Sequence, residues 1–312
     1  MILINNKLPV VIGVDHGYGN IKTANFCFPT GVTAWDSEPA FKNDLLVYNG
    51  RYYTIGVGHK EYTADKIEDE DFYILTLAAI ARELKKQNMS TAQVFLGVGL
   101  PLTWVGEQKE KFKAYLLRNG IADFSFRGQE YHVGFVGAEV FPQGFSAVAG
   151  QLRSFHGANI LCDIGNGTMN ILGIDNGRPN PSKCFTEKFG TFQCTLAAKE
   201  ELLRKLGKAV DESIIENVLR RGTADVADSV LTVIRETAKQ YVGGIMRRLR
   251  EHGYDQDLMK LYVMGGGSCL VKNFAEYAPN RVTINGDICA TAKGYEQLAA
   301  RQLVGKTSGG AK

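Results

Sequence analysis

The stretch VIGVDHGYGNIKTANF, residues 11–26, decides the fold that the sequence predicts. A short apolar run ends in Asp15, and Gly17 and Gly19 interrupt the chain before a second β-type run begins. Glycine adopts positive φ angles at bends where a side chain would be strained. The pattern therefore predicts a strand, a tight turn and a second strand.

A near copy of this pattern, NILCDIGNGTMNILGI, occupies residues 159–174. Here Asp163 ends the apolar run, and Gly165 and Gly167 follow at the same spacing. One Asp-x-Gly-x-Gly hairpin alone is more often an ordinary turn than a ligand site. Two copies in the same order indicate two similar domains built on one plan.

Both hairpins suit the binding of a polyphosphate. Glycines let the backbone approach a ligand closely, so that successive N–H groups can converge on phosphate oxygens. An Asp at the end of a strand suits Mg²⁺, which keeps several waters and uses only one or two carboxylates. The sequence therefore predicts that the two hairpins hold one polyphosphate from both sides.

Composition sets the outer limits of the function. The chain has 312 residues, enough for two domains, and a formal net charge of +3, too small to indicate nucleic-acid or membrane binding. Its six cysteines form no CxxC pair and are typical of buried, reduced thiols. The amino terminus has no basic signal region, and no apolar run is long enough to span a bilayer. We therefore expect a cytoplasmic protein.

Strand and helix patterns alternate along the first 150 residues. Hairpins are predicted at residues 45–56, around Asn49-Gly50, and at residues 124–136, around Arg127-Gly128. The other elements predicted here are an amphipathic helix over 71–87, a buried strand over 92–101 and a charged helix over 106–119.

The second half of the chain is predicted to be mainly helical after its hairpin. The predicted elements are a helix over 191–207, a long helix within 224–253, a strand, glycine turn and helix over 261–277, and a last helix over 287–304. We expect a first domain at 1–150 that the helix 287–304 rejoins, a second domain at 151–286, and a flexible tail at 305–312. The glycine turn holds Gly265, Gly266 and Gly267, which suit close approach to a ligand.

In this order the parts resemble the actin-like ATPases, the superfamily of actin, sugar kinases and heat-shock chaperone ATPases. Within it the chain is most similar to the bacterial ParM/StbA plasmid-segregation group. The segments that carry the resemblance span nearly the whole chain: VIGVDHGYGNIK, AEVFPQG, LCDIGNGTMN, VMGGGS and DICATAKGYEQL. The most specific are the D-x-G-x-x-N-x-K from Asp15 to Lys22 and the ATAKGY from Ala290 to Tyr295.

The resemblance implies an α/β fold of duplicated actin-like (ribonuclease-H-like) domains with a nucleotide cleft between them. It implies ATP or GTP and Mg²⁺ as cofactors, with Asp15 and Asp163 near the metal. The residues implied around the phosphates are Gly17, Tyr18, Gly19, Asn20, Lys22, Gly165, Asn166, Gly167 and Thr168. Gly265, Gly266 and Gly267 would line the adenosine.

Glu139, in AEVFPQG, would orient or activate the attacking water, so the implied catalytic residues are Glu139, Asp163 and Asp15. Without the resemblance, Glu139 reads as an exposed loop acid. Two positions depart from the family pattern D-x-G-G-G-T-x-D, because Asn166 replaces a glycine and Asn170 replaces the last Asp. Asn tolerates left-handed backbone, which predicts that Asn166 keeps the turn. The loss of a carboxylate at Asn170 predicts weaker metal binding.

The implied function is a head-to-tail filament that polymerises with ATP or GTP, hydrolyses it, and segregates or positions plasmid DNA. The chain would contact an adaptor protein bound to centromere-like plasmid DNA, and would bind neither nucleic acid nor membrane itself. Three alternatives stay open: a small-molecule kinase of the same fold, a chaperone-type switch, and a nucleotide-binding scaffold with little turnover. Transfer of phosphate to a small metabolite would identify the kinase, and Asn170 favours the scaffold.

Overall fold

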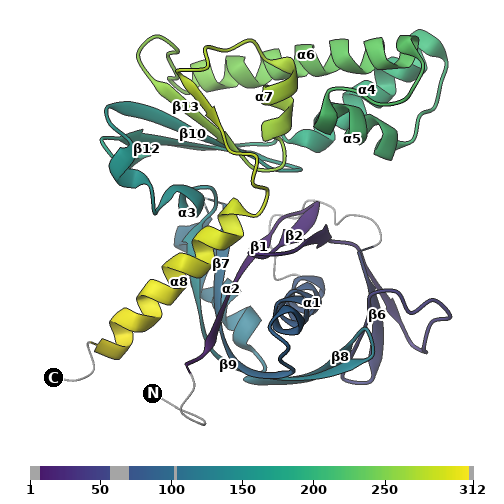
Figure 1. Cartoon of the computed structure of the whole chain (residues 1–312), viewed down its shortest axis with the longest axis vertical. Coiled ribbons are helices and arrows are strands. Elements are labelled where there is room, and N and C mark those ends of the chain that lie inside the picture. Colours follow the sequence, from purple (N-terminus) through teal and green to yellow (C-terminus); the bar gives the residue numbers. More distant parts are fainter. Residues whose placement is uncertain (1–7, 57–69, 102–103, 309–312) are drawn as a thin grey trace. The chain divides into compact units, whose positions relative to one another are not determined.

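The computed structural model describes residues 8–56, 70–101 and 104–308 of the chain (Figure 1). The chain divides into two compact units. Unit 1 comprises Met1–Gly150 and Cys289–Lys312, and unit 2 comprises Gln151–Ile288. The C-terminal helix therefore belongs to the same unit as the N-terminal strand.

Unit 1 is built on one nine-stranded sheet with the order β3-β2-β1-β7-β9-β8-β5-β6-β4. β1 is parallel to β7, and β7 to β9, while the other neighbours are antiparallel. The strands are β1 (Val10–His16), β2 (Asn20–Lys22), β3 (Cys27–Pro29), β4 (Val32–Trp35), β5 (Leu45–Tyr48), β6 (Arg51–Ile55), β7 (Thr91–Leu100), β8 (Ile121–Phe126) and β9 (Gln129–Pro142).

The two predicted hairpins of unit 1 are confirmed. Asn49 and Gly50 have φ angles of 50° and 74°, and Arg127 and Gly128 have φ angles of 53° and 75°. Positive φ at both central residues defines the type I′ turn, whose twist matches that of the flanking strands.

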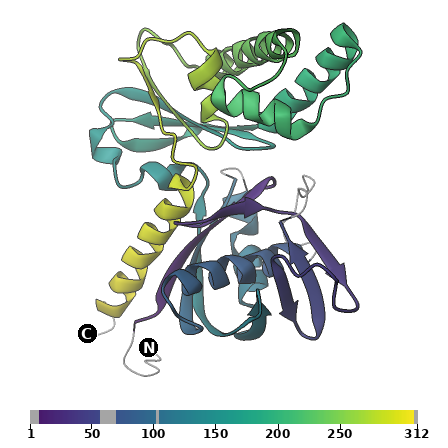
Figure 2. The same cartoon turned by 45° about the vertical axis from the view of Figure 1, so that its right-hand side comes forward.

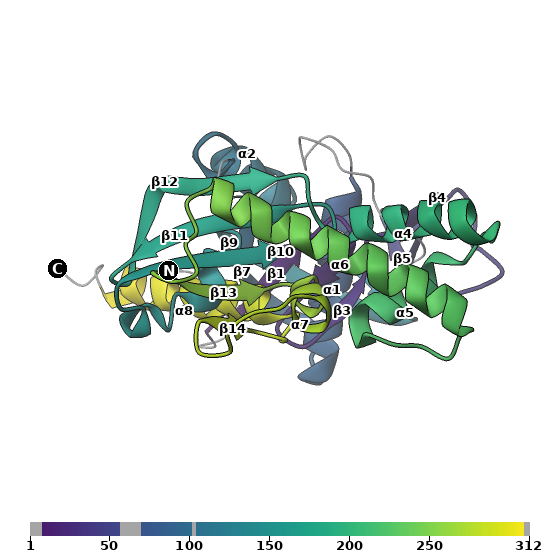
Figure 3. The same ribbon diagram turned by 90° about the horizontal axis from the view of Figure 1, so that it is seen from above.

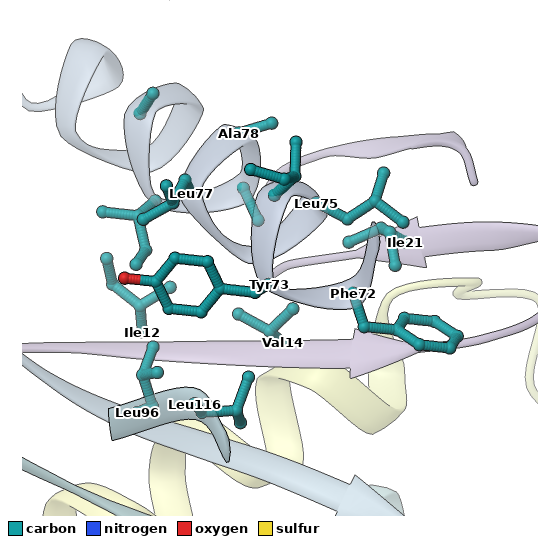
Figure 4. Packing of buried hydrophobic residues seen from close by; sticks show 14 of the residues in the cluster. Ile12, Val14, Ile21, Phe72, Tyr73, Leu75, Leu77, Ala78, Leu96 and Leu116 are labelled. Atoms are coloured by element: carbon teal, nitrogen blue, oxygen red, sulfur yellow. The ribbon is translucent and has the colours of Figure 1, made fainter. Parts of the chain in front are cut away.

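Helix α1 (Asp71–Lys86) lies inside the curled sheet of unit 1 (Figure 1). The predicted helix is confirmed, but it buries more than one face, because every residue from Phe72 to Leu84 except Arg82 is buried. Figure 4 shows Tyr73 among the side chains of β1, β7 and α2 (Val105–Leu117). Burial on all sides is typical of a helix in a protein core, and α1 lies in the core of unit 1.

Helix α8 (Ala290–Ser308) packs backbone to backbone on β1 and β7 (Figures 1 and 2). A Cβ atom added to Gly13 would lie 2.0 Å from the carbonyl oxygen of Ala292. Cβ atoms added to Gly97 and Gly99 would lie 2.6 Å and 1.9 Å from the carbonyl and phenol oxygens of Tyr295. Glycines on the strands thus admit the helix. α8 starts three residues later than expected and includes residues 305–308, which the sequence assigned to a tail.

Unit 2 holds a five-stranded sheet with the order β12-β11-β10-β13-β14, and α6 crosses one face of it (Figure 3). The strands are β10 (Ala158–Ile164), β11 (Met169–Asp175), β12 (Arg178–Glu187), β13 (Lys260–Met264) and β14 (Val282–Ile284). The helices are α4 (Thr191–Leu206), α5 (Glu212–Arg221), α6 (Asp228–Glu251) and α7 (Ser268–Phe274). The sequence predicted all of these elements except α5, β12 and β14.

The two sheets repeat one arrangement. The order β3-β2-β1-β7-β9 in unit 1 corresponds to β12-β11-β10-β13-β14 in unit 2. In both, the first three strands form an antiparallel meander and the last three are parallel. In each unit an Asp near the end of the first strand pairs with the residue seven positions later, Asp15 with Lys22 and Asp163 with Asn170. The two hairpins are therefore equivalent parts of a duplicated domain.

Two further expectations concern the surface of the chain. In the described part of the chain, no helix combines the length and apolarity needed to cross a membrane. Cys27 is exposed, against the expectation of buried thiols, whereas Cys162 is fully buried. Burial, with Asp163 as a second cause, raises the pKa of the Cys162 thiol and keeps it protonated.

Candidate functional site

In unit 1, both carboxylate oxygens of Asp15 have a partner. The Lys22 ammonium lies 3.4 Å from Oδ2, and Gln143 donates from Nε2 to Oδ1 over 3.3 Å. Asp15 is only 7% exposed, so these contacts hold a buried charge. Gln143 is a site residue that the sequence analysis missed, although it lies in the AEVFPQG segment.

The loop after Asp15 is tight for a reason other than the one predicted. Gly17 does not have a positive φ angle, but a Cβ atom there would lie 2.7 Å from the carbonyl oxygen of Asn20. Thr30 fixes the loop through two hydrogen bonds. Its Oγ1 donates to the Tyr18 carbonyl over 2.6 Å, and its N–H donates to the Gly19 carbonyl over 3.2 Å. The ring of Tyr18 lies in the core of unit 1, so a ligand at this loop would meet the backbone of Tyr18 and not its ring.

His16 joins the end of β1 to helix α1 through a hydrogen bond. Its Nε2 lies 2.8 Å from Thr76 Oγ1, and this hydroxyl donates its own proton to the Phe72 carbonyl over 2.6 Å. The hydroxyl proton is therefore used, and Nε2 of His16 must be the donor. The contact ties the residue next to Asp15 to the core helix α1.

Glu139 lies in β9 and is 7% exposed, which excludes the reading of an exposed loop acid. The Nζ atom of Lys109, in α2, lies 2.7 Å from Glu139 Oε1. The pair is a charge-assisted hydrogen bond with its acidic partner inside the protein. Asp15 and Glu139 are thus both buried carboxylates with a lysine beside them.

In unit 2, the hairpin after Asp163 closes on itself. The N–H of Gly165 donates to the Thr168 carbonyl over 2.8 Å, and a Cβ atom on Gly165 would lie 3.3 Å from that oxygen. Neither Gly165 nor Gly167 has a positive φ angle. The prediction that positive φ explains these glycines is therefore wrong, and close approach explains Gly165.

The first turn of α4 braces this hairpin. The N–H groups of Thr191 and Phe192 donate to the carbonyls of Gly165 and Asn166 over 3.0 Å and 2.9 Å. Thr191 Oγ1 also lies 3.2 Å from Asn166 Oδ1. A Cβ atom on Gly190 would lie 2.2 Å from the Asn166 carbonyl oxygen, so only glycine allows this approach.

The prediction of left-handed backbone at Asn166 is wrong, because Asn166 is not among the non-glycine residues with positive φ. Its side chain and carbonyl hold the turn instead, through the contacts with α4. The sequence analysis missed Gly190 and Thr191, whose only signal is their position at the start of a predicted helix.

The glycine run after β13 lies directly beside Asp163. Gly265 has a φ angle of 81°, and a Cβ atom there would lie 2.3 Å from Asp163 Oδ1. The N–H of Gly267 donates to the Ile164 carbonyl over 2.9 Å, whereas a Cβ atom on Gly266 would meet nothing within 4 Å. The structure thus brings together the second hairpin and the glycine run, which lie about a hundred residues apart in the sequence.

Asn170 in β11 pairs with Asp163 in β10, and its side chain is buried and hydrogen-bonded. The hydroxyl of Thr186 lies 2.9 Å from Asn170 Oδ1 and donates to it. An amide at this position avoids a second carboxylate next to Asp163, since like charges directly opposite one another destabilise a sheet. The hairpin of unit 2 therefore offers one carboxylate.

Two family models match most of the chain. Residues 13–145 match the N-terminal domain of the actin-like proteins, and residues 161–276 match the C-terminal domain of the archaeal, MreB-like actin homologues. The chain belongs to the actin-like proteins. A search by sequence among curated proteins finds no match.

Solved structures of actin homologues share the fold of this actin-like protein. The archaeal actin homologue Ta0583 in complex with ADP is 21% identical, with a TM-score of 0.71 over 94% of this chain and 99% of its own. Bacillus thuringiensis ParM with ATP is 13% identical, with a TM-score of 0.70 over 96% and 100%. The Alp12 filament structure is 18% identical, with a TM-score of 0.66 over 94% and 98%. These matches confirm the two-domain, actin-like α/β fold.

The donor set of the actin-like protein fits Mg²⁺ bound together with phosphate. Among the residues that the structure describes, no group of three or more His, Cys, Asp or Glu side chains can hold a metal ion alone. Asp15 and Asp163 are single carboxylates at the ends of equivalent strands. Mg²⁺ keeps several waters and is usually held by one or two carboxylates and the phosphates of the substrate.

Proposed function

We propose that this actin-like protein binds ATP or GTP with Mg²⁺ through both hairpins, polymerises in the nucleotide-bound form, and hydrolyses the nucleotide. The observation that carries the proposal is the repeated hairpin. In each unit an Asp and a glycine loop follow the same strand of the same five-strand arrangement. Duplication of a loop that suits phosphate supports a ligand with several phosphates.

Similar proteins support the proposal. Ta0583 is in complex with ADP, B. thuringiensis ParM is with ATP, and the Alp12 structure is that of a filament. A head-to-tail contact that repeats without closing generates a helical filament, and ATP and its hydrolysis product would favour different conformations of the subunit.

Each part of the proposed mechanism has a residue in this chain. Asp15 and Asp163 would hold the waters of Mg²⁺, which when bound offsets the negative charge of the phosphate oxygens. The backbones of Gly17–Asn20 and Gly165–Thr168 would bind the phosphates, and Gly265–Gly267 the nucleoside. Glu139 would orient the attacking water.

We further propose that the filament segregates or positions plasmid DNA through an adaptor protein that binds the DNA. The resemblance to the ParM/StbA group supports this step. The cytoplasmic location expected from the sequence stays a prediction.

The proposal is tested by nucleotide binding, phosphate release and light scattering of the purified chain. Asp163→Asn is expected to weaken nucleotide binding at least about tenfold and to abolish polymerisation, because it removes the single carboxylate of the second hairpin. The matched control is Asp123→Asn, at a position on β8 whose side chain is 75% exposed. Absence of binding to ATP, ADP and GTP by the natural chain, or an Asp163→Asn variant that binds normally, would refute the proposal.

Asn170 favours a second candidate function, a nucleotide-binding scaffold with little turnover. Its side chain is an amide, hydrogen-bonded by Thr186, where the family pattern has an Asp. The second hairpin therefore lacks another carboxylate for the metal. Nucleotide-dependent polymers without phosphate release would identify the scaffold.

A further inference from the structure

We propose that Tyr241, in α6, is a positioning residue that holds the second hairpin in the form that binds phosphate. This inference rests on the proposed function and adds to it a residue that lies outside both hairpins and the glycine run. Tyr241 acts through Gly190, whose carbonyl accepts a hydrogen bond from the Tyr241 hydroxyl over 2.7 Å. Gly190 in turn packs directly on the backbone of Asn166, in the hairpin.

The start of α4 fixes the direction of two peptide groups in the hairpin. The carbonyls of Gly165 and Asn166 accept hydrogen bonds from the N–H groups of Thr191 and Phe192. In a trans peptide the N–H points away from the carbonyl, so the N–H groups of Asn166 and Gly167 point away from the start of α4. A Cβ atom on Gly167 would meet nothing within 4 Å, so the backbone is open there. Two successive N–H groups on an open side suit phosphate oxygens.

Gly190 sets the position of α4 against the hairpin. It immediately precedes the helix, and a Cβ atom on it would lie 2.2 Å from the Asn166 carbonyl oxygen. Side chains bind both polar groups of its backbone. Its N–H donates to Gln193 Oε1 over 2.8 Å, and its carbonyl accepts from Tyr241. Gln193 belongs to α4 itself, whereas Tyr241 ties the turn to a second helix.

The ring of Tyr241 is held in place by its neighbours. It is stacked on the ring of Phe189, with the centroids 4.2 Å apart and the planes 6° from parallel. The guanidinium of Arg248 lies 3.8 Å from the centroid of the same Phe189 ring. Gly244, in the interior of α6, leaves room for this ring, because a Cβ atom there would lie 3.0 Å from Phe189 Cζ. The Tyr241 hydroxyl therefore extends from a fixed ring.

The direction of the hydrogen bond is settled by the proton of the phenol. Burial, with Cys194 as a second cause, raises the pKa of the Tyr241 hydroxyl, which therefore keeps its proton. The hydroxyl donates this proton to the Gly190 carbonyl, which can only accept. Loss of the hydroxyl would release the turn before α4, and with it the two N–H groups that orient the hairpin.

The experiment measures the dissociation constants of ATP and GTP, each with Mg²⁺, well below the melting temperature of every variant. Tyr241→Phe removes the hydroxyl and keeps the stacked ring. Gln193→Leu removes the acceptor of the Gly190 N–H. Tyr48→Phe is the matched control, because it removes a tyrosine hydroxyl that accepts a hydrogen bond from Asn119 Nδ2 over 2.8 Å. Tyr48 is also buried, and its strand β5 is separated from β1 by β7, β9 and β8.

We expect Tyr241→Phe to raise the dissociation constant about three- to tenfold, the effect of one lost hydrogen bond. Gln193→Leu should weaken binding by a similar factor. Tyr48→Phe should lower the melting temperature but leave the dissociation constant unchanged. Well below the melting transition nearly every molecule is folded, so a residue that only stabilises the fold does not change the measured affinity.

Three results would overturn the inference. Normal nucleotide binding by Tyr241→Phe, while Asp163→Asn binds weakly, would show that Tyr241 does not position the hairpin and would leave the proposed function intact. An equal loss of affinity in Tyr48→Phe would show that affinity follows general stability. Absence of nucleotide binding by the natural chain would overturn the inference together with the proposed function.

Discussion

Gly265→Ala adds one methyl group where Asp163 and the backbone leave no room for it. The new Cβ atom would lie 2.3 Å from Asp163 Oδ1 and 2.5 Å from the carbonyl oxygen of Ile164. The φ angle of 81° is also one that alanine rarely adopts. The substitution therefore combines backbone strain with displacement of a carboxylate that we assign to the nucleotide site.

The two costs have separate magnitudes. Left-handed backbone costs an alanine about 1–2 kcal/mol, and overpacking of a well-filled site costs about 1–3 kcal/mol more. For a unit of this size each kcal/mol lowers the melting temperature by roughly 2–4 °C, so a fall of the order of 10 °C is expected. Movement of the Asp163 carboxylate is expected to weaken nucleotide binding at least about tenfold.

Thermal unfolding and nucleotide titration of matched variants separate the two costs. Gly253 has a φ angle of 86° and nothing within 4 Å of its Cβ position, so Gly253→Ala carries the backbone strain alone. Gly266→Ala carries neither cost and should melt at the temperature of the natural chain, while Gly253→Ala, far from the glycine run in sequence, is the control for nucleotide binding. The reasoning is refuted if Gly265→Ala is no less stable than Gly253→Ala and binds nucleotide normally.

Three further predictions concern α8, a half-buried acid and the second hairpin. Gly99→Ala, whose Cβ atom would lie 1.9 Å from a phenol oxygen of α8, should destabilise the chain by about 1–3 kcal/mol in thermal melts, unlike Gly120→Ala, which has open space. Burial raises the pKa of Glu296 above its ordinary 4.5, so its contribution to stability is fully present below pH 4.5 and is lost as the pH rises through the raised folded-state pKa. Glu296→Gln should therefore melt at a higher temperature than the natural chain at pH 7 but not below pH 4.5, and equal melting at pH 7 would contradict this. Asn170→Asp puts a carboxylate opposite Asp163 and should cost about 0.2–1 kcal/mol without metal, a loss that added Mg²⁺ and nucleotide reverse if the proposed site is correct.

Local signals predicted the parts of the fold that depend on neighbours in sequence. Asn49-Gly50 marked a type I′ turn, and the two Asp-x-Gly-x-Gly stretches marked hairpins that occupy equivalent places in two sheets. The apolar spacing of α1 showed a helix, but periodicity cannot distinguish one buried face from burial on every side. That distinction depends on the nine-stranded sheet, whose order joins strands far apart in the chain.

The candidate site also combines residues that short motifs mark with residues that only the fold brings in. Asp15, Asp163 and the glycines stand in motifs that the sequence itself displays, whereas Gln143, Lys109 and Gly190 enter through contacts between distant segments. The sequence also does not show why the hairpins need glycines. At Gly17 and Gly165 a side chain would crowd a nearby carbonyl oxygen. A sequence shows a small residue but not the atom that requires it.

The packing of α8 on β1 and β7 has a consequence for the order in which a nascent chain folds. Translation delivers all strands of unit 2, up to Ile284, before the ribosome reaches Ala290. Until then Phe95 and Phe141, which α8 covers through Tyr295, stay open to water. Unit 1 is therefore the first unit to be synthesised and the last to complete its core. A chain cut short before α8 would expose an apolar sheet face that favours aggregation.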